Sequence, residues 1–372
     1  MASTLLPATT GPHAVGNRRL FLIDAARQDP FSGAATRQVS VTAWYPTTDT
    51  GPAARYLSGN DGFDATMALD LTNGLEGRSC FSWFGGAPTC FGVSLADTMH
   101  PRIRARDTRA VLDAAPNVNL GALPVAIISP GFGVPGNHLS ILAQELASHG
   151  YLALTLSHTW ESIVTELATS VAKQNGSAVS NAWPTVLAAR VGDVKFVLDQ
   201  LATLPHGIGT VADTARVAVV GHSFGGPTGL ELAYQDARVR AVAVLDGTAG
   251  YAGCPNLAQD NGIPQPVLLL SGPIDLDDNF LTGAEHASWA TYAATNHGPL
   301  HLLEVAGARH YAFTDVGLLS TKTADLCGTI TPARAMTLHP LFVRAFLDRY
   351  LAGVPTTLLD GAHPDWPEVT SV

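Results

Sequence analysis

The sequence contains little charge and no concentrated basic segment. Only 14% of its 372 residues are Asp, Glu, Lys or Arg, whereas 46% are hydrophobic; an average globular chain carries roughly 25% charged residues. The 21 Lys and Arg residues are scattered, with no basic run longer than Arg18-Arg19, and the formal net charge is −10. Nucleic-acid binding needs a concentrated basic face, so this composition argues against a nucleic-acid partner. It also excludes a largely disordered chain and a coiled coil.

The sequence also lacks long apolar runs. No stretch approaches the roughly 18 to 20 uninterrupted apolar residues of a transmembrane helix, so we expect a soluble chain. Residues 1–16 have neither the basic start nor the apolar centre of a signal peptide, although a chain from which such a peptide had been removed would look the same. With 372 residues, one large domain or two small ones are compatible with usual domain sizes of roughly 100 to 200 residues.

Cysteine is scarce, with four residues in the whole chain. Cys80 and Cys90 flank a loop containing Gly and Pro that a disulfide could close, and Cys254 and Cys327 could form a second bridge. We expect both bridges and therefore a secreted or periplasmic protein, whereas reduced thiols would indicate the cytoplasm. No Cys-x-x-Cys or His-x-x-x-His pair lies beside a second pair of ligands, so we expect no metal and no cofactor.

From Leu123 onward, short apolar runs alternate with helical patterns. The runs that we expect to be strands are 124–129, 151–156, 217–220, 241–245, 267–270 and 300–305. Helices are expected over 138–148 and 339–351. A further amphipathic helix over 185–201 carries an apolar stripe made of Leu187, Val191, Val194, Leu198 and Leu201. This alternation predicts an α/β fold with a mostly parallel central sheet and helices on both faces.

We interpret residues 15–355 as a single domain, with 1–14 and 356–372 as terminal extensions. Residues 39–45 alternate apolar and polar side chains, like a strand with one buried face. Residues 50–120 then form a long irregular insertion, rich in Gly and in aromatic residues that include Phe81, Trp83, Phe84 and Phe91. Long loops in compact domains are commonly lids or binding loops, so we expect this insertion to cover a functional site and to select what binds there.

The strongest motif is Gly221-His222-Ser223-Phe224-Gly225-Gly226, which follows the strand ending at Val220 and opens a helix reaching about Tyr234. In this strand–turn–helix setting, G-x-S-x-G is typical of a nucleophile elbow, because small residues at both ends let the chain turn sharply and expose Ser223. The alternative is a Gly-rich turn or a phosphate loop. No Lys follows the glycines and the spacing fits neither phosphate pattern, so we interpret Ser223 as a nucleophile.

A serine hydroxyl is a poor nucleophile until a base takes its proton. Among the 13 histidines, His310 follows the last expected strand, 300–305, and this is where the base stands in such an architecture. A single histidine is usually a packed or surface residue, and its position in the chain is what distinguishes His310.

The base in turn needs a carboxylate that fixes the imidazole tautomer. Two candidates end successive strands: Asp246 follows 241–245, and Asp275 follows 267–270. Asp277 and Asp278 crowd the second candidate, which has the composition of a solvated acidic loop or a weak cation site. The residues alone leave both candidates open.

A tetrahedral intermediate also needs two amide donors for its oxyanion. The amide of Phe224, directly after the nucleophile, supplies the first donor. We expect the second in Ser129-Pro130-Gly131-Phe132-Gly133, most naturally from the Phe132 amide, because glycines on either side free that backbone to turn inward.

Together these motifs resemble the α/β-hydrolase superfamily and, more narrowly, the platelet-activating factor acetylhydrolase-like serine esterases and their bacterial relatives. The resemblance spans most of residues 15–355 in chain order. It rests on Trp44-Tyr45-Pro46, Ser129-Pro130-Gly131-Phe132-Gly133, Leu146-Ala147-Ser148-His149-Gly150-Tyr151, Gly221-His222-Ser223-Phe224-Gly225-Gly226, Val244-Leu245-Asp246-Gly247 and the helix over 342–351. In that family the acid follows the strand after the nucleophile helix, which implies Asp246 as the acid and His310 as the base.

Two segments depart from the family pattern. The chain has Pro130-Gly131 where the family usually has His-Gly, and Ser157-His158-Thr159-Trp160-Glu161 where relatives often carry His-Arg-Asp. These regions would shape the acyl or alcohol pocket. Trp160, together with His222 beside the nucleophile, is therefore a candidate substrate-binding residue.

The resemblance implies a serine ester hydrolase that acts through an acyl-enzyme on short-chain or phospholipid-like acyl esters. Two other enzyme hypotheses share the same site: a polyester or triglyceride hydrolase, and a biosynthetic acyltransferase or thioesterase in which an alcohol or amine replaces water. A non-catalytic ligand receptor on the same fold is the fourth hypothesis, because a fold does not fix a function. Slow turnover of activated esters with tight ligand binding would favour the receptor.

Overall fold

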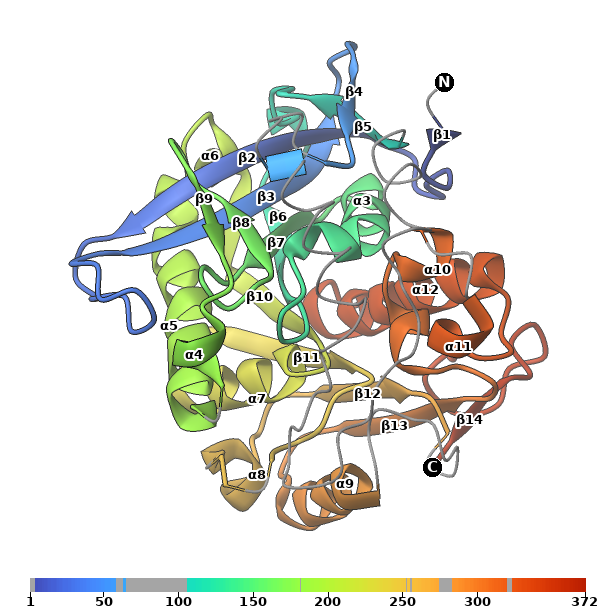
Figure 1. The fold of residues 1–372 in the computed structure, drawn as a ribbon. Helices are drawn as coiled ribbons and strands as arrows, with labels where there is room; N and C mark the ends of the chain where they lie inside the picture. The colour runs from blue at the N-terminus through green and yellow to red at the C-terminus, as the bar shows by residue number, and fades with distance from the viewer. Residues whose placement is uncertain are drawn as a thin grey trace.

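A large sheet runs through the computed structural model, which describes residues 4–57, 63–64, 106–180, 182–251, 253–254, 256–273, 283–319 and 323–372. Among these residues twelve strands form the sheet (Figure 1). Their order is β1 (Thr4–Leu5), β5 (Arg106–Leu112), β2 (Ala14–Asp24), β3 (Arg37–Thr47), β7 (Leu152–Ser157), β6 (Leu123–Ser129), β10 (Ala212–His222), β11 (Val239–Leu245), β12 (Val267–Ser271), β13 (Leu300–Val305) and β14 (Val369–Ser371), with β4 (Ala53–Arg55) paired to β5.

The six strands from β7 to β13 pair in parallel, and they are the six expected from the sequence. Both faces of these strands are covered, which explains their near-continuous apolar composition. Along β10, for example, Val217 and Val219 belong to one hydrophobic cluster, whereas Ala218 and Val220 belong to the other. The predicted α/β-hydrolase architecture is confirmed.

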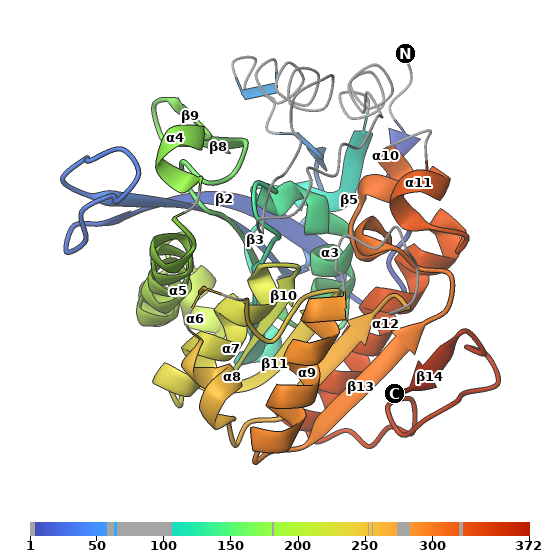
Figure 2. The same ribbon diagram turned by 60° about the horizontal axis from the view of Figure 1, so that its bottom comes forward.

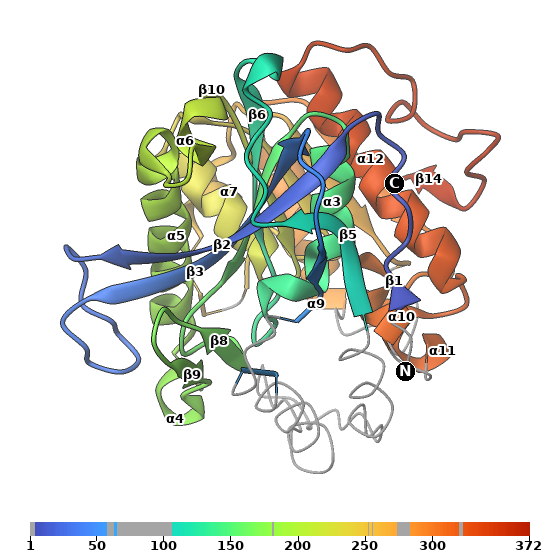
Figure 3. The ribbon, with the colours of Figure 1, turned by 90° about the horizontal axis from the view of Figure 1, so that it is seen from above.

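Helices cover the two faces of the sheet (Figure 3). One face, here called the α3 face, packs against α3 (Ser140–Ser148) and α12 (Pro332–Leu351). The opposite face, the α5 face, packs against α5 (Trp183–Gln200), α7 (Gly225–Gln235), α8 (Leu257–Asn261) and α9 (Gly283–Thr295). Shorter elements are η2 (Gly136–Leu139), the hairpin β8 (Val164–Glu166) and β9 (Val171–Lys173), α4 (Gly176–Val179), α6 (Ile208–Val211), η4 (His310–Phe313), α10 (Val316–Leu319) and α11 (Thr323–Cys327).

The C-terminal helix begins earlier than the sequence predicts. The sequence predicts a helix over 339–351, but α12 begins at Pro332. The hydroxyl of Thr331 caps this helix by accepting a hydrogen bond from the Arg334 amide at 3.3 Å. Thr331-Pro332 is therefore the true start signal, and Pro340 lies inside the helix.

Short strands from outside the regular region extend the sheet at both edges (Figure 2). The segment 50–120 contributes β4 and β5, which pair with each other and place β5 beside β2. The first and last residues contribute β1 and β14. The aromatic part of the expected insertion, with Phe81, Trp83, Phe84 and Phe91, lies outside the described residues.

The expected bridge between Cys254 and Cys327 is absent. Both side chains are buried, free thiols, and they lie in hydrophobic clusters on opposite faces of the sheet. A disulfide requires Cα atoms within about 7 Å, and an intervening sheet prevents this. Burial raises the pKa of Cys254 to about 11 and that of Cys327 to about 12, so both are inert thiols. Cys80 and Cys90 lie outside the described residues.

None of the helices in the described part of the chain is long and apolar enough to cross a membrane.

Candidate active site

Ser223 stands at the turn between β10 and α7, the strand–turn–helix setting that the sequence predicts. Its φ of 53° lies in the left-handed region, which a non-glycine residue adopts at an energetic cost. Two hydrogen bonds hold this conformation: its amide donates to the Leu245 carbonyl, and its carbonyl accepts from the Gly226 amide, both at 2.9 Å. The turn also requires glycine at 221, because a Cβ there would lie 2.1 Å from the backbone of Gly225.

Asp246 and His310 are joined by a short hydrogen bond. Asp246 directly follows β11, and its Oδ2 accepts from Nδ1 of His310 at 2.6 Å. Its Oδ1 accepts from the Gly272 amide at 2.8 Å, so both carboxylate oxygens have fixed donors. Asp246 is fully buried and His310 is 6% exposed. This arrangement holds His310 in the tautomer whose Nε2 is free of the proton, as a general base requires.

The competing acid, Asp275, lies outside the described residues, as do Asp277 and Asp278. Among the described residues, the carboxylate that contacts His310 is Asp246. Its backbone φ of 44° resembles that of Ser223, so two of the three predicted residues occupy strained positions at neighbouring strand ends.

His222 supports the His310 loop and is itself almost fully buried, at 1% exposed. Its Nε2 donates to the backbone carbonyl of His310 at 3.1 Å, and the two imidazole rings lie 4.7 Å apart. Burial, reinforced by the nearby His310, holds the pKa of His222 well below its ordinary value, so the ring is neutral. The structure thus places His222 against the backbone of His310, with almost none of its ring exposed.

The loop over 129–133 lies against both His222 and Ser223. A Cβ on Gly131 would lie 3.1 Å from Cβ of Ser223 and 3.5 Å from its Oγ. The two residues expected to supply oxyanion donors, Phe132 and Phe224, are also close, with ring centroids 6.5 Å apart in an edge-to-face arrangement. Phe224 caps the N-terminal end of α7, where backbone amides favour negative charge.

Aromatic side chains form a wall beside this loop on the α5 face. Trp183 lies 5.1 Å from Phe132 and 5.7 Å from Phe224, and Tyr251 stacks on Phe224 at 5.1 Å, all between ring centroids. Phe224 is buried, whereas Phe132, Trp183 and Tyr251 are half-buried. These four residues are called the aromatic wall below. Trp183 and Tyr251 were not expected from the sequence.

A buried ion pair lies behind the same loop. Nη1 of Arg190, on α5, contacts Oε2 of Glu161 at 2.8 Å, and both side chains are at most 1% exposed. Oε1 of Glu161 accepts from the Gly133 amide at 2.8 Å. Nη2 of Arg190 donates to the Pro130 carbonyl and, at 3.1 Å, to Oγ of Ser129. Burial raises the pKa of Glu161, whereas Arg190 favours its ionised form.

A second set of buried polar groups continues from this pair. Oγ of Ser129 is 3.0 Å from Nε2 of His158, and Nδ1 of His158 donates to Asp193 at 2.9 Å. Arg37 in turn donates to Asp193 at 2.7 Å and 3.0 Å. Burial, helped by Arg190, lowers the pKa of His158 to about 3, so the ring is neutral. Burial alone would raise the pKa of Asp193, but Arg37 and His158 hold it far below its ordinary value.

The sequence analysis did not identify these charged residues. Arg190 and Asp193 interrupt a second stripe of α5 whose members, Val186, Arg190, Asp193 and Val197, are all buried. Their steps of four, three and four residues match a helical face. Two charges on an apolar face are the signal that could have identified them, since buried charges require partners.

Trp160 adjoins this network through its neighbour Glu161. It is half-buried on the α5 face, and its φ of 66° makes it another strained non-glycine residue. Its carbonyl accepts from the Asn175 amide at 2.8 Å, which fixes the turn that presents Glu161 to the loop. A contact of Trp160 with substrate stays a prediction.

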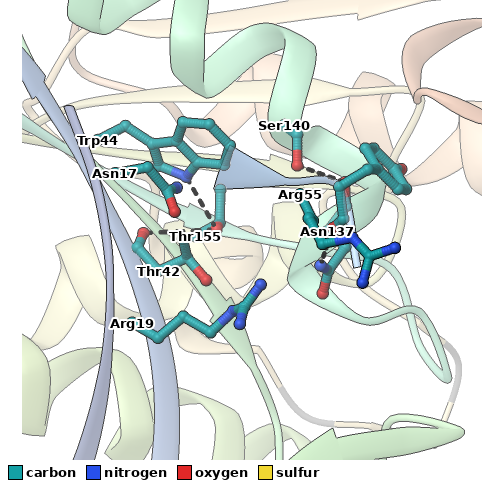
Figure 4. A pocket seen from close by; sticks show the side chains of 9 residues that line it. Asn17, Arg19, Thr42, Trp44, Arg55, Asn137, Ser140 and Thr155 are labelled. Carbon is teal, nitrogen blue, oxygen red and sulfur yellow. Dashed lines mark hydrogen bonds between the residues drawn. The ribbon is translucent and has the colours of Figure 1, made fainter. Parts of the chain in front are cut away.

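A separate polar pocket opens on the α3 face (Figure 4). Its lining includes Arg19 from β2, Arg55 from β4 and Asn137 from η2, but not Ser223, Asp246 or His310. Nδ2 of Asn137 donates to the Tyr56 carbonyl at 2.8 Å. Arg19 already donates to the Leu57 carbonyl at 3.0 Å. This pocket is distinct from the site around Ser223.

Another buried carboxylate is that of Asp315, which lies between η4 and α10 and contacts the N-terminal end of α3. It accepts from the amides of Ser140 at 3.0 Å and Ile141 at 3.3 Å. Burial raises its pKa to about 7 against the opposing effect of these amides. Among the described residues, no three His, Cys, Asp or Glu side chains form a group that could hold a metal ion.

The chain is similar to esterases over most of its length. The family model "Platelet-activating factor acetylhydrolase, isoform II" matches residues 208–354. A probable 1-alkyl-2-acetylglycerophosphocholine esterase of Arthroderma benhamiae is 27% identical, covering 99% of this chain and 94% of that protein. A platelet-activating factor acetylhydrolase of Cavia porcellus is 26% identical, covering 61% of this chain and 57% of that protein.

A solved structure matches the whole fold. The ferulic acid esterase from Streptomyces cinnamoneus superposes with a TM-score of 0.79 at 29% identity, and each chain is covered completely. The sheet order and the serine at the elbow define an α/β-hydrolase. With these relatives, the chain is identified as an esterase of that class, and the resemblance predicted from the motifs is confirmed.

Proposed function

We propose that the protein cleaves carboxylic esters through an acyl-enzyme formed on Ser223. The observation that carries this proposal is the 2.6 Å hydrogen bond between Asp246 and His310 beside a serine held at a strained elbow. Because Nδ1 of His310 donates to Asp246, its Nε2 is available to take the proton of the Ser223 hydroxyl. Ser223 Oγ then attacks the ester carbonyl.

The resulting oxyanion is bound by the backbone amides of Phe132 and Phe224. When the tetrahedral intermediate collapses, the bond to the alcohol breaks and His310 returns the proton to the departing oxygen. Water then attacks the acyl-enzyme with His310 as base, which releases the carboxylic acid and restores Ser223. Asp246 stabilises the protonated imidazole in both halves of the cycle.

Short acyl esters, including those of phospholipid-like alcohols, are the substrate class that we propose. The relative from Arthroderma benhamiae is described as acting on a 1-alkyl-2-acetylglycerophosphocholine, in which the cleaved acyl group is acetyl. In this chain Trp183 and Tyr251, from the aromatic wall, pack against the rings of the two residues whose amides are the proposed oxyanion donors. Trp160 and His222 remain proposed neighbours of the substrate.

A second candidate substrate class is favoured by the aromatic wall itself. Its half-buried rings offer stacking surfaces for an aromatic acyl group, and the solved neighbour is described as a ferulic acid esterase. Hydroxycinnamate esters therefore belong in any substrate panel. A higher kcat/KM for methyl ferulate than for a matched alkyl ester would select this candidate.

The primary test combines a fluorophosphonate probe with an ester panel of graded acyl length. We expect the probe to label Ser223, and Ser223→Ala to lose both labelling and hydrolysis of p-nitrophenyl acetate. The expected loss in kcat is at least about 10³-fold, by comparison with the removal of other triad nucleophiles. Retained turnover in a folded Ser223→Ala protein would refute the assignment, and tight ligand binding with negligible turnover in the native protein would favour a receptor.

We further propose that residues 15–355 form one domain, to whose sheet the terminal segments add β1 and β14, and that the protein acts outside the cytoplasm. The location depends on a bridge between Cys80 and Cys90, since Cys254 and Cys327 are free. Alkylation of the denatured, unreduced protein should then modify two thiols, identified by peptide mapping as Cys254 and Cys327. Modification of all four thiols would contradict the exported location.

A further inference from the structure

Both proposed oxyanion donors are connected to the same buried ion pair. We propose that Arg190 and Glu161 position the oxyanion hole by fixing the Phe132 and Phe224 amides relative to each other. The inference rests on the proposed esterase function, since an oxyanion hole has meaning only for acyl transfer. Arg190 and Glu161 act through the backbone and are therefore positioning residues.

On the loop side, the ion pair holds the backbone on both sides of Phe132. Arg190 binds the Pro130 carbonyl, two residues before Phe132. Glu161 binds the Gly133 amide, one residue after it, at 2.8 Å. Gly133 has a φ of 73°, and glycine has little intrinsic preference for one backbone conformation. The Ile163 amide also donates to the Gly133 carbonyl at 2.9 Å, and the ion pair adds the two side-chain contacts that orient the Phe132 peptide.

On the helix side, the same guanidinium reaches the residue after the nucleophile. Nε of Arg190 donates to Oγ1 of Thr228 at 3.2 Å, and this hydroxyl donates to the Phe224 carbonyl at 2.8 Å. The guanidinium carbon also lies 5.4 Å from the centroid of the Phe224 ring. One planar group therefore spans the two backbone segments that bear the donors, which a flexible lysine could not reproduce.

The position of the guanidinium is fixed in turn by the polar groups behind it. Ser129 Oγ accepts from Arg190 and donates to the neutral His158, which donates to Asp193. Every link in this chain is buried. An oxyanion hole stabilises the transition state best when its amides are already in place before negative charge develops on the carbonyl oxygen. Rigid support of this kind therefore favours catalysis.

A contribution to stability does not by itself explain why the protein has a buried ion pair at this place. Desolvation makes a buried ion pair weak evidence for stabilisation, and well-packed apolar residues often replace one without loss. The double variant Arg190→Met/Glu161→Met therefore separates the two roles. Removing both charges should restore much of the stability that either single change loses. It cannot restore the hydrogen bonds to the Pro130 carbonyl and the Gly133 amide.

The experiment measures kcat and KM for p-nitrophenyl acetate, together with urea unfolding, at a temperature where each variant is folded. We expect Glu161→Met and Arg190→Met to lower kcat by about 10²-fold, the order of magnitude for loss of one oxyanion donor. KM should stay within about threefold of the native value, because the ground-state carbonyl is bound weakly by the hole. Arg190→Lys should fall between these variants and the native protein.

Asp29→Asn provides the matched control. Asp29 forms a buried ion pair with Arg37 at 2.7 Å, and among the described residues its side chain bonds to Phe31, Ser32 and Arg37 and not to the 129–133 loop. Arg37 keeps its bonds to Asp193 in this variant. The Asp29→Asn substitution should lower the free energy of unfolding by an amount similar to that of the single variants, while leaving kcat within about threefold of native. A double variant that regains stability but keeps the low kcat supports the proposal; a double variant that regains both refutes it.

If a single variant does not fold, the double variant and Ser129→Ala decide the question. Ser129→Ala keeps both charges and removes one contact of Arg190, so we expect a loss in kcat of about fivefold to tenfold with KM unchanged. Native kcat in both folded variants would overturn the proposal. Failure of the proposed function is distinguishable, because the native protein would then neither hydrolyse the ester nor label at Ser223.

Discussion

The two halves of the proposed site are held together by different forces. In the triad half, backbone hydrogen bonds between strand ends position the residues: Ser223 donates to the Leu245 carbonyl and Asp246 to the Leu270 carbonyl, both at 2.9 Å. In the oxyanion half, a glycine-containing loop is held by the buried charges of Arg190 and Glu161. Neighbouring parallel strands align their ends by pairing. The loop beyond the sheet has a single backbone hydrogen bond from a distant segment among the described residues, which the Ile163 amide donates to the Gly133 carbonyl at 2.9 Å.

Because the two halves are held by different contacts, we expect substitutions in one half to leave the geometry of the other half unchanged. The triad acid is buried within the sheet edge and receives neutral donors, so its environment depends on the register of β10, β11 and β12. The oxyanion loop depends on side chains from α5 and from the segment after β7. Substitutions in the first half should affect proton transfer, and those in the second should affect stabilisation of the intermediate.

The largest expected effect concerns the triad acid. Asp246→Asn keeps the volume of the side chain but favours the wrong imidazole tautomer in His310, so we expect kcat to fall by up to about 10⁴-fold. Asp275→Asn is the matched control and should be nearly silent. Measurement of kcat for p-nitrophenyl acetate decides between them. A silent Asp246→Asn with an inactive Asp275→Asn would transfer the role to Asp275 and leave Ser223 and His310 in place.

A smaller effect is expected where a side chain supports the triad half. His222→Phe removes the hydrogen bond from Nε2 to the His310 carbonyl. We expect kcat to fall about tenfold, because an unpaired buried carbonyl costs about 1–3 kcal/mol and can shift the loop. His222→Gln, which retains a donor, should recover most of the rate. Equal rates in His222→Phe and the native enzyme would show that backbone pairing alone positions His310.

The smallest expected effect concerns Asp315, a buried carboxylate held by backbone amides. Its folded-state pKa of about 7 is raised above the ordinary value of 3.8, so the folded state binds its proton more tightly than the unfolded state. The stability that Asp315 provides is therefore present below about pH 4 and lost as the pH rises through about 7.

Urea unfolding of the native protein and of Asp315→Asn at pH 5 and pH 8 tests this expectation. The amide cannot titrate, so the variant should gain on the order of 2 kcal/mol relative to the native protein between these pH values. Both proteins should retain esterase activity. A constant difference between the two unfolding free energies would show that Asp315 is ionised in the folded protein throughout.

The features predicted from the sequence are those that local pattern determines. The parallel strands follow from apolar runs that are buried on both faces, and the elbow at Ser223 follows from its glycines. His310 follows from its place after the last parallel strand. The structure joins it to Asp246, the acid that the resemblance implies. The catalytic roles of these residues remain predictions.

Other features depend on contacts between distant segments. Arg190 and Glu161 are 29 residues apart, and neither has a local pattern that reveals its partner. β1, β4 and β14 have two or three residues each, too few for a periodic pattern, and they form by pairing to longer strands. The expected bridge between Cys254 and Cys327 was wrong for the same reason, because an even number of cysteines says nothing about the sheet between them.

The Arg190–Glu161 pair has a consequence for how such proteins can diverge. Replacing either residue alone would leave a buried charge unpaired beside the proposed oxyanion loop, so we expect such a protein to be both less stable and less active. We therefore expect homologues that lack this ion pair to have replaced both residues, together with residue 129 or 158, which contact the same network. Across homologues, positions 161 and 190 should covary, and relatives that lack the pair should hold the loop with a different residue before the oxyanion donor.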